Sequence, residues 1–218
     1  MVRPRMMDAE KWSAAVNAAG LGFHGIGIAW LFFQAPVQEN IVNLILAVVF
    51  AITNILFWIM QMTYHLVRKP EKEKEMLRRV DHVTVFYLVI GSFSPAISRY
   101  GAGVMIPVAL VTLWCLAIVG TMLRLFWARI PRVFTPIFSF LMAVVCIVSM
   151  IIAVTAIPVP GIIIFIVGSV LLITGGVVYA IKKPDPVPGT FGSHEVYHVL
   201  VLAGAILMYF LVVIALVS

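Results

Sequence analysis

Four ionisable side chains of this chain have the types and spacing to hold and use a metal ion: His65, Asp81, His194 and His198. His194 and His198 are four residues apart, so on a helix they share one face and can bind a single ion together. Three imidazoles around a tetrahedral ion leave one position open, as in catalytic zinc sites, and imidazole suits zinc. The pattern therefore predicts a zinc ion held by His65, His194 and His198, with Asp81 at the same level.

Composition limits the kind of molecule that could position these residues. The 218 residues are 63% hydrophobic and only 11% charged, whereas soluble domains carry about 25% charged residues. The formal net charge of +6 does not indicate a nucleic-acid partner, because the basic residues are confined to gaps between long apolar runs. The composition predicts an integral membrane protein of the cell (plasma) membrane, with lipid as its environment and possible substrate.

Apolar runs of about 20 residues each predict spanning helices. The longest run divides at Pro158 and Pro160, because proline removes a backbone donor and ends helices. We read the first run as an uncleaved helix, since it is too long for a signal peptide. The fold class is therefore an all-α seven-transmembrane bundle, a single domain over residues 1–218, with helices near 13–34, 41–66, 82–98, 101–125, 133–156, 160–181 and 194–217.

Basic residues set the predicted orientation of the bundle. Every lysine and arginine except Arg99 precedes the first predicted helix or lies at the end of, or after, the second, fourth or sixth. Because such residues accumulate on the cytoplasmic side, the N-terminus should be cytoplasmic and the C-terminus outside. His65 then ends a helix at the cytoplasmic side, while Asp81, His194 and His198 begin helices there. Three distant segments thus bring these groups to one level of the membrane, where ionisable residues indicate function.

Simpler interpretations of the same residues remain open. Asp81 could cap the start of the third helix, and the two histidines of the seventh helix could be interface residues. His82 fits interface packing or an outer hydrogen bond to the site better than direct ligation. His24, among glycines in the first helix, is expected to be buried with a structural partner. Cys115 and Cys146 stand alone in apolar runs and predict no disulfide.

A literal H-E-x-x-H motif at His194-Glu195-Val196-Tyr197-His198 allows another interpretation. In metalloproteases this motif supplies two zinc ligands and a glutamate base. A carboxylate in the first turn of a helix is also favoured by the helix dipole without any chemistry. Glu195 could therefore be a catalytic base or only a charge at the helix start.

Several of these residues belong to short sequence motifs that resemble those of the hemolysin III branch of the progestin and adipoQ receptor family. This family consists of seven-helix proteins and includes the adiponectin receptors. The resemblance implies zinc on His65, His194 and His198 near the cytoplasmic face, with Asp81 beside a zinc-bound water. The family pattern usually has a serine where this chain has Gln61, often a histidine at Met208, and an asparagine at Gly20. The motifs are Tyr64-His65, Asp81-His82 through Phe86 and Gly91 to Pro95, Lys183-Pro184-Asp185-Pro186 through Phe191-Gly192 to His194-Glu195 and His198, and, more loosely, His24-Gly25-Ile26-Gly27.

The site and the resemblance together predict a hydrolase of a lipid amide or ester, similar to the ceramidase activity attributed to relatives. Asp81 would orient the attacking water or take its proton. One alternative is a non-enzymatic receptor or regulator of membrane state, in which zinc only ties helices together. Another is an intramembrane metalloprotease based on Glu195. A secreted pore-forming toxin, suggested by the family's name, fits helices with inward basic loops poorly.

Overall fold

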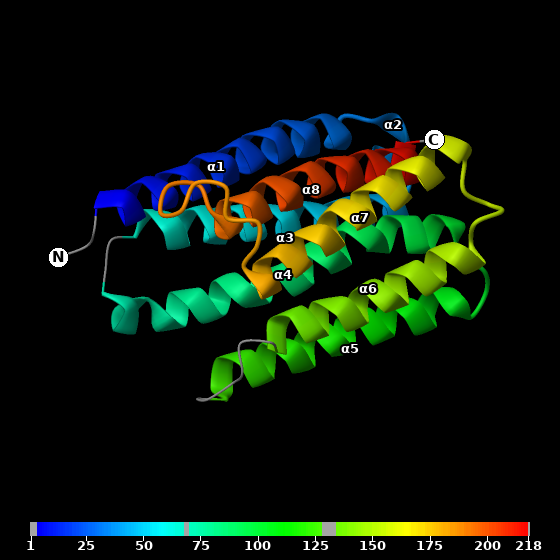
Figure 1. Cartoon of the computed structure of the whole chain (residues 1–218). Coiled ribbons are helices and arrows are strands. Elements are labelled where there is room, and N and C mark those ends of the chain that lie inside the picture. The colour runs from blue at the N-terminus through cyan, green and yellow to red at the C-terminus, as the bar shows by residue number, and fades with distance from the viewer. Residues whose placement is uncertain (1–3, 68–69, 128–133, 218) are drawn as a thin grey trace.

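The computed structural model of the chain is a bundle of roughly aligned helices (Figure 1). It describes residues 4–67, 70–127 and 134–217, with the backbone alone for residues 4–9, 71 and 72. Arg3, parts of two predicted basic loops (68–69 and 128–133) and the predicted first residue of the fifth helix, 133, lie outside the described residues. The helices are α1 (Pro4–Phe32), α2 (Ala35–Gln38), α3 (Ile41–Leu66), α4 (Glu71–Tyr100), α5 (Met105–Phe126), α6 (Phe134–Ile152), α7 (Val159–Ile181) and α8 (Ser193–Val217).

Among the described residues, seven of these helices are long and apolar enough to cross a membrane. They coincide with the seven predicted spans, and the short α2 is an addition between the first two. The division at the paired prolines is confirmed, since α7 begins at Val159, directly after Pro158, and α6 ends at Ile152, four residues before its predicted end. The predicted all-α, seven-helix class therefore agrees with the structure.

The third spanning helix is longer than the sequence pattern indicated. It was expected to begin at residue 82, but α4 begins at Glu71. The added residues alternate acidic and basic side chains, most of them good helix formers. Glu75 bonds Arg79 one turn later, with 3.1 Å between Oε1 and Nε, and it also contacts Arg78. The charges end the apolar run and leave the helix itself intact, because i,i+3 and i,i+4 pairs support it.

The first helix also continues beyond its apolar run. It begins at Pro4 instead of residue 13 and ends at Phe32, before α2. After α2, Asn40 caps α3, because its side-chain oxygen accepts from the amides of Val42 and Asn43 at 2.9 and 3.3 Å. The early start places Glu10 on a helix, beside the end of α3.

Two helices form the interior of the bundle. α4 contacts α3, α5, α6 and α8, and α8 contacts α1, α4 and α7. Fully buried Phe86, Ile90, Leu113, Met142 and Met208 fill the space between α4, α5, α6 and α8. α3 and α8 meet through side chains, such as Asn43, whose Nδ2 donates to the carbonyl of Leu216 at 3.2 Å, and α1 and α4 each pack against both helices. The space enclosed by α1, α3, α4 and α8 is where the predicted ligands meet.

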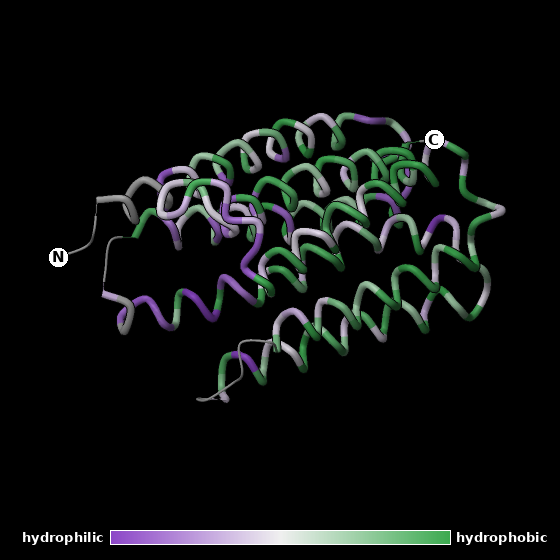
Figure 2. Tube along the Cα trace, in the orientation of Figure 1, coloured by the Kyte–Doolittle hydropathy of each residue, from purple (hydrophilic) through white to green (hydrophobic). Residues whose placement is uncertain are grey.

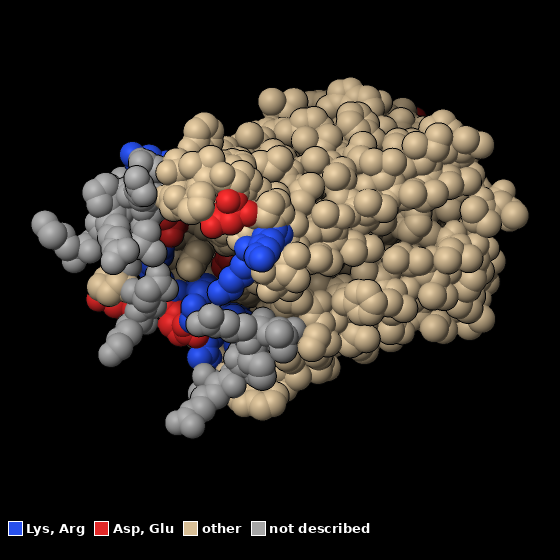
Figure 3. Space-filling view, in the orientation of Figure 1, with Lys and Arg blue, Asp and Glu red and all other residues tan. Residues whose placement is uncertain are grey.

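The outer surface of the bundle suits lipid. Large apolar side chains such as Ile26, Ile52, Val111 and Ile166 are exposed along the helices. Figure 2 shows apolar segments along the length of the bundle and hydrophilic ones concentrated toward its ends, most clearly in the first turns of α4. Visible lysine and arginine side chains gather at the end where the chain begins (Figure 3). This distribution agrees with a multi-pass membrane protein.

Candidate metal centre

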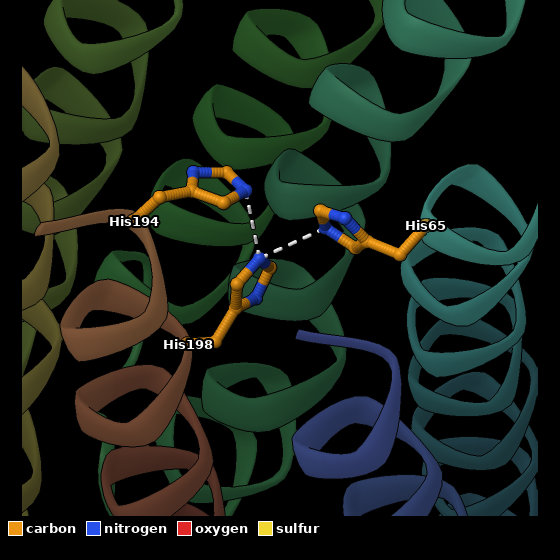
Figure 4. Close-up of side chains that lie close together, drawn as sticks. All are labelled: His65, His194 and His198. Carbon is orange, nitrogen blue, oxygen red and sulfur yellow. Dashed lines mark hydrogen bonds between the residues drawn. The ribbon is translucent and has the colours of Figure 1, made fainter. Parts of the chain in front are cut away.

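Three imidazoles converge at the charged end of the bundle. His65 lies in the last turn of α3, and His194 and His198 lie in the first two turns of α8. Figure 4 shows the rings pointing toward one another from the two helices. Nε2 of His198 lies 3.0 Å from Nε2 of His65 and 3.1 Å from Nε2 of His194. One nitrogen from each of the three residues lies within 4.8 Å of the other two.

The hydrogen-bonding capacity of these rings supports metal binding. Nδ1 of His65 lies 2.7 Å from Oε2 of Glu10 and donates its proton to that carboxylate. Nε2 of His65 therefore carries a lone pair. Nε2 of His198 has at most one proton, so it can donate to only one of its two nitrogen neighbours. A cation at the centre would instead use all three lone pairs at once.

The spacing of the nitrogens also fits an ion. Zinc–nitrogen bonds of about 2.0–2.1 Å in a tetrahedron place the ligating nitrogens about 3.3 Å apart. The two distances of 3.0 and 3.1 Å need only a small expansion to reach that value, and the third pair, between His65 and His194, lies within 4.8 Å. Imidazole ligands are compatible with zinc and with several other transition metals, so the geometry supports a metal without identifying it.

Glu10 is the residue of this site that the sequence did not reveal. Its carboxylate bonds the back of a candidate ligand, which is the usual arrangement around zinc-bound histidines and fixes the reactive nitrogen. Its side chain is 43% exposed, whereas that of His65 is only 2% exposed. The one signal available was that Glu10 precedes the first apolar run on the same side of the membrane as the histidines.

Asp81 lies inside α4, in the wall of a large cavity that His194 also lines. It does not cap the helix, because α4 begins at Glu71, so the capping interpretation is wrong. Asp81 is buried, and within the described part of the chain its Oδ1 has no hydrogen-bond partner. An unsatisfied carboxylate oxygen in a membrane interior is costly. A water or substrate atom in the cavity would satisfy it.

The cavity has a volume of about 1420 Å³ and extends between α4, α6, α7 and α8. Its deeper walls are apolar and include Phe93, Phe140, Ile147 and Leu172. Its mouth is charged and includes Arg78 and Arg124. In Figure 3 blue and red side chains surround a hollow at this end of the molecule. The arrangement can accept a molecule with a polar head and a long apolar tail.

Comparison with known proteins gives the chain a family. Residues 14–209 match the model of the haemolysin-III related family. The chain belongs to this family. It is also similar to the hemolysin-3 homolog of Bacillus subtilis strain 168, with 22% identity over 196 residues that cover 87% of this chain and 89% of that protein. Membership in the hemolysin III branch, as the motifs indicated, is confirmed. Glu10 precedes the matched region.

Two positions at which this haemolysin III-related chain departs from the family pattern are both buried. Gln61, where the resemblance implies a serine, lines the cavity together with Asp81 and His194. Met208, where the resemblance implies a histidine in many relatives, packs within the apolar interior. Gln61 can still donate and accept hydrogen bonds at the cavity wall, whereas Met208 adds no polar group.

His82 is near the site but does not belong to the three-histidine cluster. Its Nδ1 donates to the carbonyl of Arg78 at 2.5 Å, so its Nε2 accepts from the hydroxyl of Tyr179 at 2.9 Å. Both ring nitrogens are thus engaged. His24 is fully buried and donates from Nδ1 to the carbonyl of Gly20 at 2.9 Å, as expected for a structural histidine.

Glu195 makes structural hydrogen bonds at the start of α8 in this haemolysin III-related protein. Its Oε2 accepts from the backbone amide of Gly192 at 2.8 Å, so it caps the start of α8. Its Oε1 accepts from Ser13 of α1 at 3.0 Å. Both oxygens are therefore engaged, and the arrangement favours a capping role over that of the glutamate base in H-E-x-x-H proteases.

Proposed function

We propose that the protein is a membrane-embedded zinc hydrolase that cleaves an amide or ester bond of a lipid. The observation that carries this proposal is a shared cavity. His194 of the three-histidine cluster and the unpartnered carboxylate of Asp81 line the same cavity, whose remaining walls are mostly apolar. Such a cavity suits an acyl chain, and its polar end suits the bond to be cleaved.

Each residue of the site would have a distinct role in the reaction. His65, His194 and His198 would hold the ion through Nε2, and Glu10 would fix the proton of His65 on Nδ1. Bound zinc supplies a nucleophile from water at neutral pH and polarises a carbonyl. Asp81 would orient the attacking water and accept its proton at the oxygen that has no other partner. Gln61 would donate to the substrate or to that water from the same wall.

A second candidate function is a regulator of membrane state in which the metal is structural. One observation favours it: the three histidines of the cluster come from two helices, α3 and α8. An ion between them would join the two helices whether or not any reaction occurs.

Metal analysis and turnover on the purified full chain test the proposal. We expect about one zinc per chain, and release of fatty acid from N-acyl or ester lipids measured by mass spectrometry. Asp81→Asn should keep the zinc and lower the rate at least a hundredfold, in the range typical for loss of a general base. Glu39→Gln, at the other end of the bundle, is the matched control and should change neither quantity.

Other results would reject parts of the proposal. Purified protein that holds no metal after zinc supplementation would exclude both candidate functions. Stoichiometric zinc with no release from either lipid class would exclude the hydrolase and favour the structural metal.

A further inference from the structure

Arg124 is a buried cation at the mouth of the cavity. It lies in the last turn of α5, is only 8% exposed and lines the cavity. No hydrogen bond or ion pair joins its guanidinium to another residue that the structure describes, and its Nε is buried without a partner. A buried charge normally has a counter-ion. Among the described residues, the Glu75 carboxylate attracts Arg124 but is bonded to Arg78 and Arg79, so no anion pairs directly with the Arg124 guanidinium.

The charged residues around Arg124 do not supply a free counter-ion either. Arg78, Arg79 and Lys182 also line the mouth, and Glu75 is the acidic residue among them. Glu75 is already engaged by Arg78 and Arg79. Nε of Arg78 is likewise buried without a partner. The preference for basic residues on the cytoplasmic side explains charges near helix ends, but it does not require a buried arginine without a counter-ion.

The cavity below the mouth is large and apolar. Its volume of about 1420 Å³ exceeds the roughly 300–1,000 Å³ of common small-molecule pockets. A small anion would fill only the mouth. A lipid would fill both parts, with its headgroup at the arginines and its chain between α4, α6 and α7.

One wall connects the mouth with the metal centre. Arg124, His82, Tyr179 and His194 all line the cavity. The Tyr179 hydroxyl donates to His82, and the Tyr179 ring lies 6.2 Å from that of His194. A molecule held at Arg124 would therefore extend along residues that lead to the candidate ligands.

We propose that the mouth binds the phosphate of an anionic lipid through Arg124, with Arg78 and Lys182 at its rim. Guanidinium groups bind phosphate through paired, charge-assisted hydrogen bonds. This inference concerns the same cavity and rests on the proposed hydrolase function. It limits the substrates of the hydrolase to lipids that carry a phosphate and excludes neutral lipids. Binding can be measured without turnover, so the two proposals can fail separately.

Two fluorescent probes with the same labelled, ether-linked alkyl chain, which a hydrolase cannot cleave, test the inference on the full chain in non-ionic detergent. One probe is an alkyl lysophosphatidic acid and the other is the matching monoalkylglycerol, which lacks the phosphate. We expect the phosphate probe to bind at least tenfold more tightly, as hydrogen bonds to charged groups allow. Arg124→Gln should remove most of this difference and leave binding of the neutral probe unchanged. Arg99→Gln, the same change at the opposite end, should alter neither affinity.

Several outcomes would overturn the inference. Equal affinities of the unmodified protein for the two probes would do so even if Arg124→Gln failed to fold. Displacement of the phosphate probe by millimolar inorganic phosphate, but not by chloride, would show a site for free phosphate instead of a lipid.

A variant of the metal centre separates the two proposals. In His198→Gln we expect hydrolysis to be lost and the preference for the phosphate probe to persist. Loss of the preference would place the phosphate on the metal, and the inference would be wrong while the hydrolase proposal stood. If the unmodified protein prefers the phosphate probe but hydrolyses no lipid, the headgroup site would be supported and the hydrolase proposal would be wrong.

Discussion

The carboxylate of Glu10 determines which nitrogen of His65 can bind a metal. A hydrogen bond from Nδ1 to that carboxylate holds the ring in one orientation and leaves the lone pair on Nε2. Partners of this kind commonly change metal affinity by about 10–100-fold. The contact matters here because the ring belongs to the one ligand that does not come from α8.

We therefore predict that Glu10→Gln weakens zinc binding by about tenfold or more. The amide oxygen can still accept the proton of Nδ1, but it has no charge to increase the basicity of the ring. Competition with a chelator of known affinity measures the change. Glu39→Gln provides the control, and equal affinities for the two variants would show that Glu10 does not support the site.

Glu195 provides a second test at the scale of single residues. Because its oxygens bond Gly192 and Ser13, Glu195→Ala should lower stability by about 0.5–2 kcal/mol, the usual cost of a lost cap, whereas Glu195→Gln keeps an oxygen that can accept from Gly192 and should cost less. Lipid hydrolysis should persist. Thermal unfolding in detergent and the hydrolysis assay measure the two effects. Cleavage of a membrane peptide that Glu195→Gln abolishes, while Asp81→Asn does not, would instead support the protease interpretation.

At the scale of elements, close approach of α1 to α3 keeps Glu10 beside His65. A Cβ added at Gly20 would lie 2.4 Å from Cε3 of Trp58, which is fully buried. A Cβ at Gly22 would meet no atom within 4 Å. The two glycines are two residues apart on the same helix, so they form a matched pair.

Gly20→Ala should destabilise the protein by about 1–3 kcal/mol, because the methyl group must displace the indole or separate the helices. Gly22→Ala should be neutral or slightly stabilising, since alanine favours the helix. Melting temperatures in one detergent compare the variants. Equal melting temperatures would show that α1 and α3 adjust without cost.

At the scale of the whole molecule, binding of the metal should stabilise the folded protein. The ligands belong to α3 and α8, and α1 and α4 pack against both helices. A ligand that binds only the folded state raises stability by about 2.7 kcal/mol at one hundred times its Kd. Zinc should therefore raise the melting temperature of the single domain that we propose, and a chelator should reverse the effect. His198→Ala should show no zinc-dependent shift, whereas His82→Ala should keep it.

The predicted orientation is testable on the same scale. Lys182 follows α7 at the charged end, and Val104 lies between α4 and α5; both side chains are exposed. In a chain with Cys115 and Cys146 replaced by alanine, Lys182→Cys should react with an impermeant thiol reagent only from the cytoplasmic side. Val104→Cys should react only from outside. The opposite labelling would reverse the predicted topology.

The sequence by itself determined the class of fold and predicted which three histidines lie together. Seven apolar runs specify seven spanning helices because lipid requires each segment to satisfy its own backbone hydrogen bonds. The same constraint fixes the depth of each residue in the membrane. Depth alone was enough to group His65 with His194 and His198, although they are far apart in the chain.

Only the tertiary structure decided how the groups around these ligands are arranged. Depth says nothing about which helix faces which, so the contact of Glu10 with His65 and the shared wall of Asp81 and His194 could not be read from spacing. The start of α4 was missed for a related reason. Charges end an apolar run, but paired charges one turn apart continue a helix into water, as Glu75 and Arg79 do.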